Sequence, residues 1–241
     1  MATESERRFG MPGLAAADAA VMDQELRAYM LRVYNYMASG LALSGIVAFA
    51  TAQSPAMMQA IFGSGLFWIV ALAPLGLLLV MSFGLNKMSA PAIQALYWAF
   101  TALMGVSLAS IFVVYTGASI ARVFFITAGT FGAMSLYGYT TKRDLTAFGS
   151  FLMMGLIGII IASVVNMFLQ SAMLQWVVSV IGVLVFVGLT AYDTQKIKSE
   201  FIAYRMQGAA AVKSSIMGAV RLYLDFLNLF LMLLRLFGNR N

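Results

Sequence analysis

Cysteine and histidine are both absent from this chain of 241 residues, and charged residues make up only 10% of it. Without these two side chains, the sequence offers no disulfide, no zinc or haem ligation through them, and no cysteine nucleophile. Every serine–histidine catalytic arrangement is excluded too, and with it a rhomboid-type serine protease. We predict neither an enzyme nor a resident cofactor.

Apolar residues take the place of the missing polar ones, since 62% of the chain is hydrophobic. A soluble domain is roughly half apolar and a quarter charged. The net charge is +6, but in a membrane protein basic residues first indicate orientation and contact with anionic headgroups. The composition therefore predicts an all-α polytopic membrane protein with lipid, and no nucleic acid, as its partner.

Seven apolar segments approach the length of about 20 residues that a hydrocarbon core requires. They cover residues 33–52, 65–85, 92–115, 118–138, 147–168, 172–195 and 215–237. Short connections favour one compact bundle, so we expect a single seven-span unit over residues 33–238. Residues 1–32 are predicted to be a cytoplasmic tail, with a short amphipathic helix at residues 22–30 lying on the membrane surface.

Lysine and arginine are concentrated at alternate span ends, which predicts the orientation of the chain. The side with most of them is expected to be cytoplasmic, with the amino terminus inside and the carboxyl terminus outside. The basic residues of that side are Arg7, Arg8, Arg27, Arg32, Lys87, Lys142, Arg143, Lys196, Lys198, Arg205 and Lys213, and those of the other side are Arg122, Arg235 and Arg240.

Two acidic residues, Asp193 and Asp225, interrupt the last two apolar spans. Ionisable residues at membrane depth are costly, and this makes them candidates for a functional site. If Arg221 marks the interface, Asp225 lies about 6 Å inside it, at a depth similar to that of Asp193. We hypothesise one shared site. The alternative is structural: Asp225 pairs with Arg221 one helical turn away, and Asp193 caps backbone or pairs with a loop lysine.

Two motifs around these acids make a family resemblance specific. Gly188-Leu189-Thr190-Ala191-Tyr192-Asp193-Thr194-Gln195 and Leu222-Tyr223-Leu224-Asp225-Phe226-Leu227-Asn228-Leu229-Phe230 resemble the signature of the Bax inhibitor-1 family, also called the transmembrane Bax inhibitor motif family, including its bacterial YccA-type branch. The stretch from Tyr29 to Met37 is similar to bacterial members.

The resemblance implies a seven-helix bundle with a central last helix, in a bacterial inner membrane. It also implies a pH-sensitive calcium leak in which Asp193 and Asp225 form the sensor and gate. Some family members carry an arginine in the second span that latches onto the sixth-span acid, whereas residues 64–86 here contain no charged residue. Either Arg221 replaces that latch or the protein gates differently.

The residues around the acids suit such a role chemically. Calcium prefers about six to eight oxygen ligands, and an incomplete cage suits transient binding during passage. Two nearby carboxylates also tend to hold one proton between them. The predicted site therefore binds calcium only as the transported ion, at Asp193 and Asp225, and its supporting residues are Arg221, Asn228, Thr190, Tyr192, Thr194 and Gln195.

Other classes of membrane protein fit less well or remain open. An intramembrane aspartyl protease would need Gly-x-Gly-Asp, and the residues before Asp225 lack both glycines. A retinal protein would need a lysine in the last span, whereas Lys213 lies outside it. Two alternatives stay open: a non-transporting regulator that binds another membrane protein, such as the FtsH protease, and a proton-coupled calcium exchanger.

Overall fold

The computed structural model describes residues 12–204 and 208–241 of the chain, most of which are helical. The helices are α1 (Pro12–Ala52), α2 (Pro55–Phe62), α3 (Leu66–Gly84), α4 (Ala90–Leu108), α5 (Ser110–Val114), α6 (Gly117–Thr140), α7 (Thr146–Leu169), α8 (Ala172–Tyr204) and α9 (Gly208–Phe237).

In the part of the chain that the structure describes, seven segments are long and apolar enough to cross a bilayer, with α4 and α5 forming one of them. The predicted all-α polytopic fold is thus confirmed. Local signals set several of the helix starts. Ser54, Ser89 and Thr116 each accept a hydrogen bond from the backbone N–H three residues later, which satisfies one free donor of the first turn.

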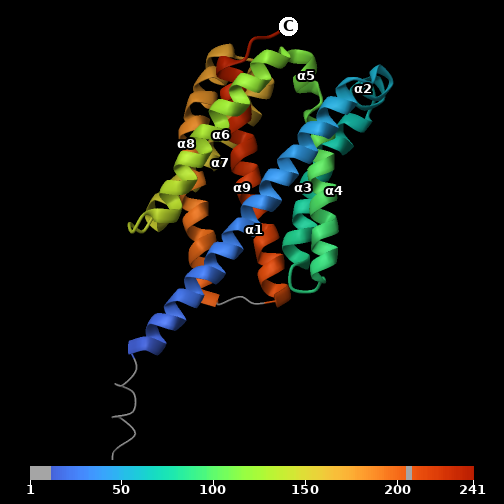
Figure 1. Cartoon of the computed structure of the whole chain (residues 1–241). Coiled ribbons are helices and arrows are strands. Elements are labelled where there is room, and N and C mark those ends of the chain that lie inside the picture. Colours follow the sequence, from blue (N-terminus) through green and yellow to red (C-terminus); the bar gives the residue numbers. More distant parts are fainter. Residues whose placement is uncertain (1–11, 205–207) are drawn as a thin grey trace, which may run out of the picture.

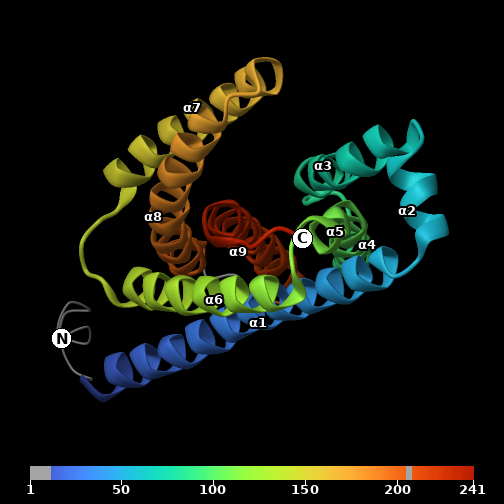
Figure 2. The same cartoon turned by 90° about the horizontal axis from the view of Figure 1, so that it is seen from above.

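The last helix, α9, is the centre of the bundle, as the family resemblance implied. Helices α1, α4, α6 and α8 pack against α9, and Figure 2 shows them arranged around it. In α9, 72% of the most apolar window is buried, against 11% in α3 and in α7. These two peripheral helices carry much of the exposed apolar surface, as lipid-facing helices should.

The first helix begins earlier than its apolar run. The amphipathic segment predicted for residues 22–30 is not a separate helix, because α1 is continuous from Pro12 to Ala52. Leu26, Met30 and Val33 are buried in the core, and the ring of Tyr29 stacks on Phe201 with centroids 4.5 Å apart. The apolar side of this segment therefore packs on the protein. The charged residues that precede Pro12 in the predicted tail lie outside the described residues.

The described chain starts and ends at opposite ends of the bundle, as Figure 1 shows. At the end where α1 begins, Lys213 donates to the carbonyl of Leu85 at 2.7 Å, and Lys198 donates to that of Tyr139 at 2.8 Å. These bonds tie the connection after α3 to α9 and the last turn of α6 to α8. The predicted basic side is therefore one structural end, apart from Arg7, Arg8 and Arg205, which lie outside the described residues.

Two glycines allow α8 to lie close to its neighbours at the motif that contains Asp193. A Cβ atom at Gly138 of α6 would overlap the carbonyl oxygen of Ala191, and one at Gly149 of α7 would overlap the ring of Tyr192. Small residues permit such close backbone approach in membranes. The segment before Asp193 is thus held from two sides.

Candidate functional site

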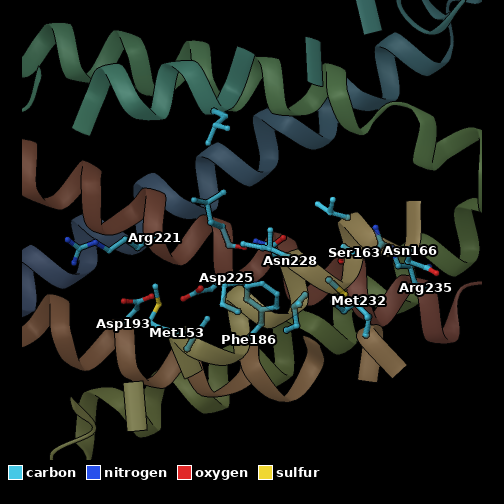
Figure 3. A pocket seen from close by; sticks show the side chains of 18 of the residues that line it. Met153, Ser163, Asn166, Phe186, Asp193, Arg221, Asp225, Asn228, Met232 and Arg235 are labelled. Carbon is cyan, nitrogen blue, oxygen red and sulfur yellow. The ribbon is translucent and has the colours of Figure 1, made fainter. Parts of the chain in front are cut away.

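Asp193 of α8 and Asp225 of α9 line the same cavity, which has a volume of about 1190 Å³. Its walls come from α3, α7, α8 and α9. Figure 3 shows Asp193 and Arg221 towards one end of it, Arg235 and Asn166 towards the other, and Asp225 and Asn228 between them. The structure therefore brings the two predicted acids together.

Asp225 is the more deeply placed of the two acids. Only 5% of its surface is exposed, and its Oδ2 atom has no hydrogen-bond partner among the described residues. A buried carboxylate without a donor is costly, so most buried polar groups in proteins are paired. Asp225 lines the cavity, and its carboxyl lies within hydrogen-bond reach of Asp193, so a proton held between the two acids would satisfy the buried oxygen.

Asp193 is less buried and lies among cations. Lys196 and Arg221 line the same cavity and both act electrostatically on Asp193, and the Nζ atom of Lys196 lies 5.5 Å from the centre of the Tyr192 ring. The acid pair therefore has one member among basic side chains near the end of the bundle and one member deeper inside.

Arg221 pairs with Glu200, not with Asp225 as the structural alternative expected. Its Nη1 atom lies 3.0 and 3.1 Å from the two carboxylate oxygens. The side chains of Arg221 and Glu200 are 37% and 28% exposed. The partner differs because α8 continues nine residues beyond the predicted span end at Gln195, and this extension carries Glu200 alongside α9. A long arginine side chain can then reach towards water.

The remaining supporting residues divide between the cavity and the packing around it. Asn228 and Tyr192 line the cavity; Asn228 also donates to the carbonyl of Leu224 at 2.8 Å. The buried hydroxyls point elsewhere: Thr190 donates to the carbonyl of Phe186 at 2.8 Å, and Thr194 lies 3.0 Å from the hydroxyl of Ser135 on α6.

Gln195 positions the connection between α6 and α7. Its amide donates to the carbonyl of Arg143 at 2.7 Å and accepts from the N–H of Leu145 at 2.9 Å. In the structure this residue, like Thr190 and Thr194, holds helices and loops together around the acid-bearing segment.

A polar wall at the far end of the cavity was missed by the sequence reasoning. Figure 3 shows Ser163 and Asn166 of α7 there with Arg235 of α9, and Gln170, which follows α7, and Gln175 of α8 line the same cavity. The signal was present, because a spacing of three residues places Ser163 and Asn166 on one side of an otherwise apolar helix. The wall supplied by α3 is apolar, with Leu75 and Leu78, consistent with the lack of charge in residues 64–86.

The oxygen atoms at this site do not form a closed cage. Within residues 12–204 and 208–241, no group of three or more acidic, cysteine or histidine side chains is placed to hold a metal ion. The site offers two carboxylates, of which one oxygen is unpaired, with amide oxygens further along the cavity. Such a donor set suits weak, exchangeable cation binding better than permanent retention.

Fold and site together define a class: a seven-span α-helical membrane protein whose last two helices place an acid pair in an internal cavity. A family model described as "Inhibitor of apoptosis-promoting Bax1" matches residues 26–241. The chain therefore belongs to the Bax inhibitor-1 family, as its two acid-bearing motifs indicated.

Its relatives include bacterial membrane proteins. The Inner membrane protein YbhL of Escherichia coli K12 is 53% identical over 217 residues, which cover 89% of this chain and 93% of that protein. An uncharacterized protein of Rickettsia prowazekii is 51% identical over 90% of this chain and 92% of its own length. A membrane protein of Streptococcus pyogenes is 32% identical, over 91% and 96% respectively.

Proposed function

We propose that this protein is a pH-sensitive calcium leak channel of a bacterial inner membrane, gated by Asp193 and Asp225. The observation that carries the proposal is the buried carboxyl of Asp225, whose Oδ2 atom accepts from no N–H or hydroxyl group of the described residues and which lies against the carboxyl of Asp193 in the cavity that both residues line. A purely structural acid would be expected to have its oxygens paired.

The chemistry of two nearby carboxylates supports pH sensing. Their mutual repulsion and their burial favour a state in which one proton is shared. When that proton leaves, the cavity gains a negative charge that attracts a divalent cation and pushes the two acids apart. When it returns, the acids can hydrogen bond to each other, and the attraction for the cation falls.

The orientation follows from the basic residues. The end that carries Lys87, Lys142, Lys198 and Lys213 would face the cytoplasm, which places Asp193 near the cytoplasmic mouth. The name of the Escherichia coli relative, an inner membrane protein, supports the same membrane.

The test is calcium flux into liposomes that contain the purified protein and a calcium-sensitive dye. We expect the parent protein to conduct calcium with a pH dependence between about pH 5 and 8, a range that brackets a perturbed carboxylate. Asp193→Asn and Asp225→Asn should each remove that pH dependence. The matched control is Asp23→Asn, which changes an exposed acid on α1 and should behave like the parent.

Two other results would replace the proposal with its alternatives. Absence of flux in the folded parent protein would favour a non-transporting regulator of another membrane protein. In that case, deletion of residues 1–20 should affect function in cells more than replacement of Asp193 does. Uptake of calcium against its gradient, driven by an imposed pH difference, would identify a proton-coupled calcium exchanger.

A further inference from the structure

A second cavity lies at the basic end of the bundle, between the α6–α7 connection and the last turns of α8. Its volume is about 660 Å³. Four basic residues line it: Lys142 and Arg143 from the connection, and Lys196 and Lys198 from α8. Two separate elements therefore direct positive charge to one place.

The acidic residues of this cavity are already engaged elsewhere. Asp144 accepts hydrogen bonds from the N–H and the hydroxyl of Thr146, at 2.9 and 2.6 Å. These two bonds lower the pKa of Asp144, so it stays charged and is held by its own helix start. Glu200 pairs with Arg221. Among the described residues, none of the four basic side chains lies within ion-pair distance of a carboxylate.

The cavity is held in a fixed shape. Gln195 bonds both to the carbonyl of Arg143 and to the N–H of Leu145, which fastens the connection to α8. Lys198 donates to the carbonyl of Tyr139, and its charge lies 4.9 Å from the centre of the Tyr139 ring.

We propose that this cavity binds a phosphate group, presented either by the headgroup of an anionic phospholipid or by a free phosphate in solution. Arginine can bind two phosphate oxygens at once, while lysines act as mobile point charges. The hydroxyls of Thr141 and Ser199 line the cavity as further donors. The cavity is lined by four cations, and the carboxylates beside them are already bonded to other groups. It therefore suits a ligand with one or two negative charges.

Phosphate binding would also act on the acid pair. Lys196 and Tyr192 line both this cavity and the one that contains Asp193. A phosphate bound beside Lys196 would reduce the positive potential at Asp193 and favour its protonation. This effect on gating rests on the proposed function, whereas phosphate binding does not.

Binding can be measured without any flux. The full chain would be reconstituted in nanodiscs of phosphatidylcholine mixed with phosphatidylglycerol, and the lipids that stay bound would be identified by native mass spectrometry. The test variant is the double replacement Lys142→Gln with Arg143→Gln. The matched control is Lys87→Gln, which removes an exposed cation from the same end of the bundle but outside the cavity.

We expect the parent and Lys87→Gln to retain phosphatidylglycerol in preference to phosphatidylcholine. The double variant should lose this preference by about a hundredfold, since each hydrogen bond between a charged side chain and the phosphate contributes roughly tenfold, whereas Lys87 lies outside the cavity and makes no such bond. Retention by the double variant at the parent level would overturn the proposal. Because both replaced side chains are exposed, Lys142→Gln alone can be substituted if the double variant folds poorly, with a loss of about tenfold.

The source of the phosphate is decided in nanodiscs of phosphatidylcholine alone. Line broadening of inorganic phosphate in ³¹P spectra, present in the parent and reduced in the double variant, would identify a soluble ligand. Retention of phosphatidylglycerol that excess inorganic phosphate cannot displace would identify the headgroup. If the parent neither retains the anionic lipid nor binds phosphate, the cavity is not a phosphate site, whatever the result of the flux experiment.

Discussion

The buried side chain of Asp225 is expected to lower the stability of the folded protein while it serves the proposed function. Its carboxylate lies on the central helix with one oxygen unpaired, so it is expected to oppose stability. We predict that Asp225→Asn, which has almost the same shape, folds with a melting temperature equal to or above that of the parent while its calcium flux loses its dependence on pH.

Thermal unfolding in detergent, followed by tryptophan fluorescence, provides the stability measurement, and liposome flux provides the functional one. Asp225→Leu is measured beside it, because this variant changes the shape of the side chain as well as its charge. A loss of both stability and flux in Asp225→Leu would then be assigned to shape, and the effects seen in Asp225→Asn to charge. A clear fall in melting temperature for Asp225→Asn would mean that the carboxylate stabilises the bundle and that its primary role is structural.

The pair formed by Arg221 and Glu200 allows the charge near the acids to be changed in both directions. Arg221→Gln removes a cation and leaves Glu200 unpaired, and both changes favour protonation of the nearby acids. The midpoint of the pH response should therefore move to more alkaline values. Glu200→Gln releases Arg221 to act on the acids, so the midpoint should move to more acidic values.

Each shift should be a few tenths of a pH unit, because the pair is partly exposed and such pairs contribute about 0.2–1 kcal/mol. The measurement is the midpoint of calcium flux against pH for the parent and both variants. Shifts of the same sign in the two variants, or no shift in either, would remove this ion pair from the sensor.

Among the helices, α8 depends on close contact with both α6 and α7. At Gly138 a methyl group would meet the backbone of Ala191, which cannot rotate away. We predict that Gly138→Ala lowers the free energy of unfolding by about 1–3 kcal/mol, the usual cost of overpacking, and alters flux through the neighbouring Asp193. Gly158→Ala on α7 is the control, because its Cβ would meet no atom within 4 Å.

The comparison is made by chemical unfolding in mixed micelles. Gly158→Ala should be neutral or slightly stabilising, since alanine is the better helix former. Equal stability of the two variants would show that α6 and α8 can separate without cost, and the segment before Asp193 would then not be clamped as described.

The same helix shows where sequence reasoning succeeded and where it stopped. The spans and the central acids could be predicted because apolar runs and isolated acids are local features. The partner of Arg221 could not be predicted, because the pairing with Glu200 requires α8 to continue past the apolar run, and α8 extends as far as Tyr204. Charged residues end a membrane span, but they do not end a helix. The polar wall of Ser163 and Asn166 was missed for a related reason, since it becomes a site only when α7 is placed beside α9.

The whole molecule has an orientation that can be tested directly, because the chain contains no cysteine. We predict that single cysteines at Gln53 and Gln170 react with an impermeant maleimide added to the outer side of the inner membrane, while a cysteine at Lys142 does not. The expected contrast in labelling is all or none, because Gln53 and Gln170 lie at one end of the bundle and Lys142 lies at the other. Labelling of the Lys142 position from outside would reverse the topology.

The central position of α9 also has a consequence for how the protein is made. The ribosome makes this helix only after the six other described spans, although four other helices pack against it. Its most apolar window has a mean hydropathy of 1.6, against 2.4 for α3 and α7, so it also enters the bilayer less readily than they do. During translation the first six spans are therefore present in the membrane before α9 covers their polar inner faces. A premature stop codon before Gly208 would remove the core of the bundle, and even a late nonsense mutation should leave a chain that membrane quality control degrades.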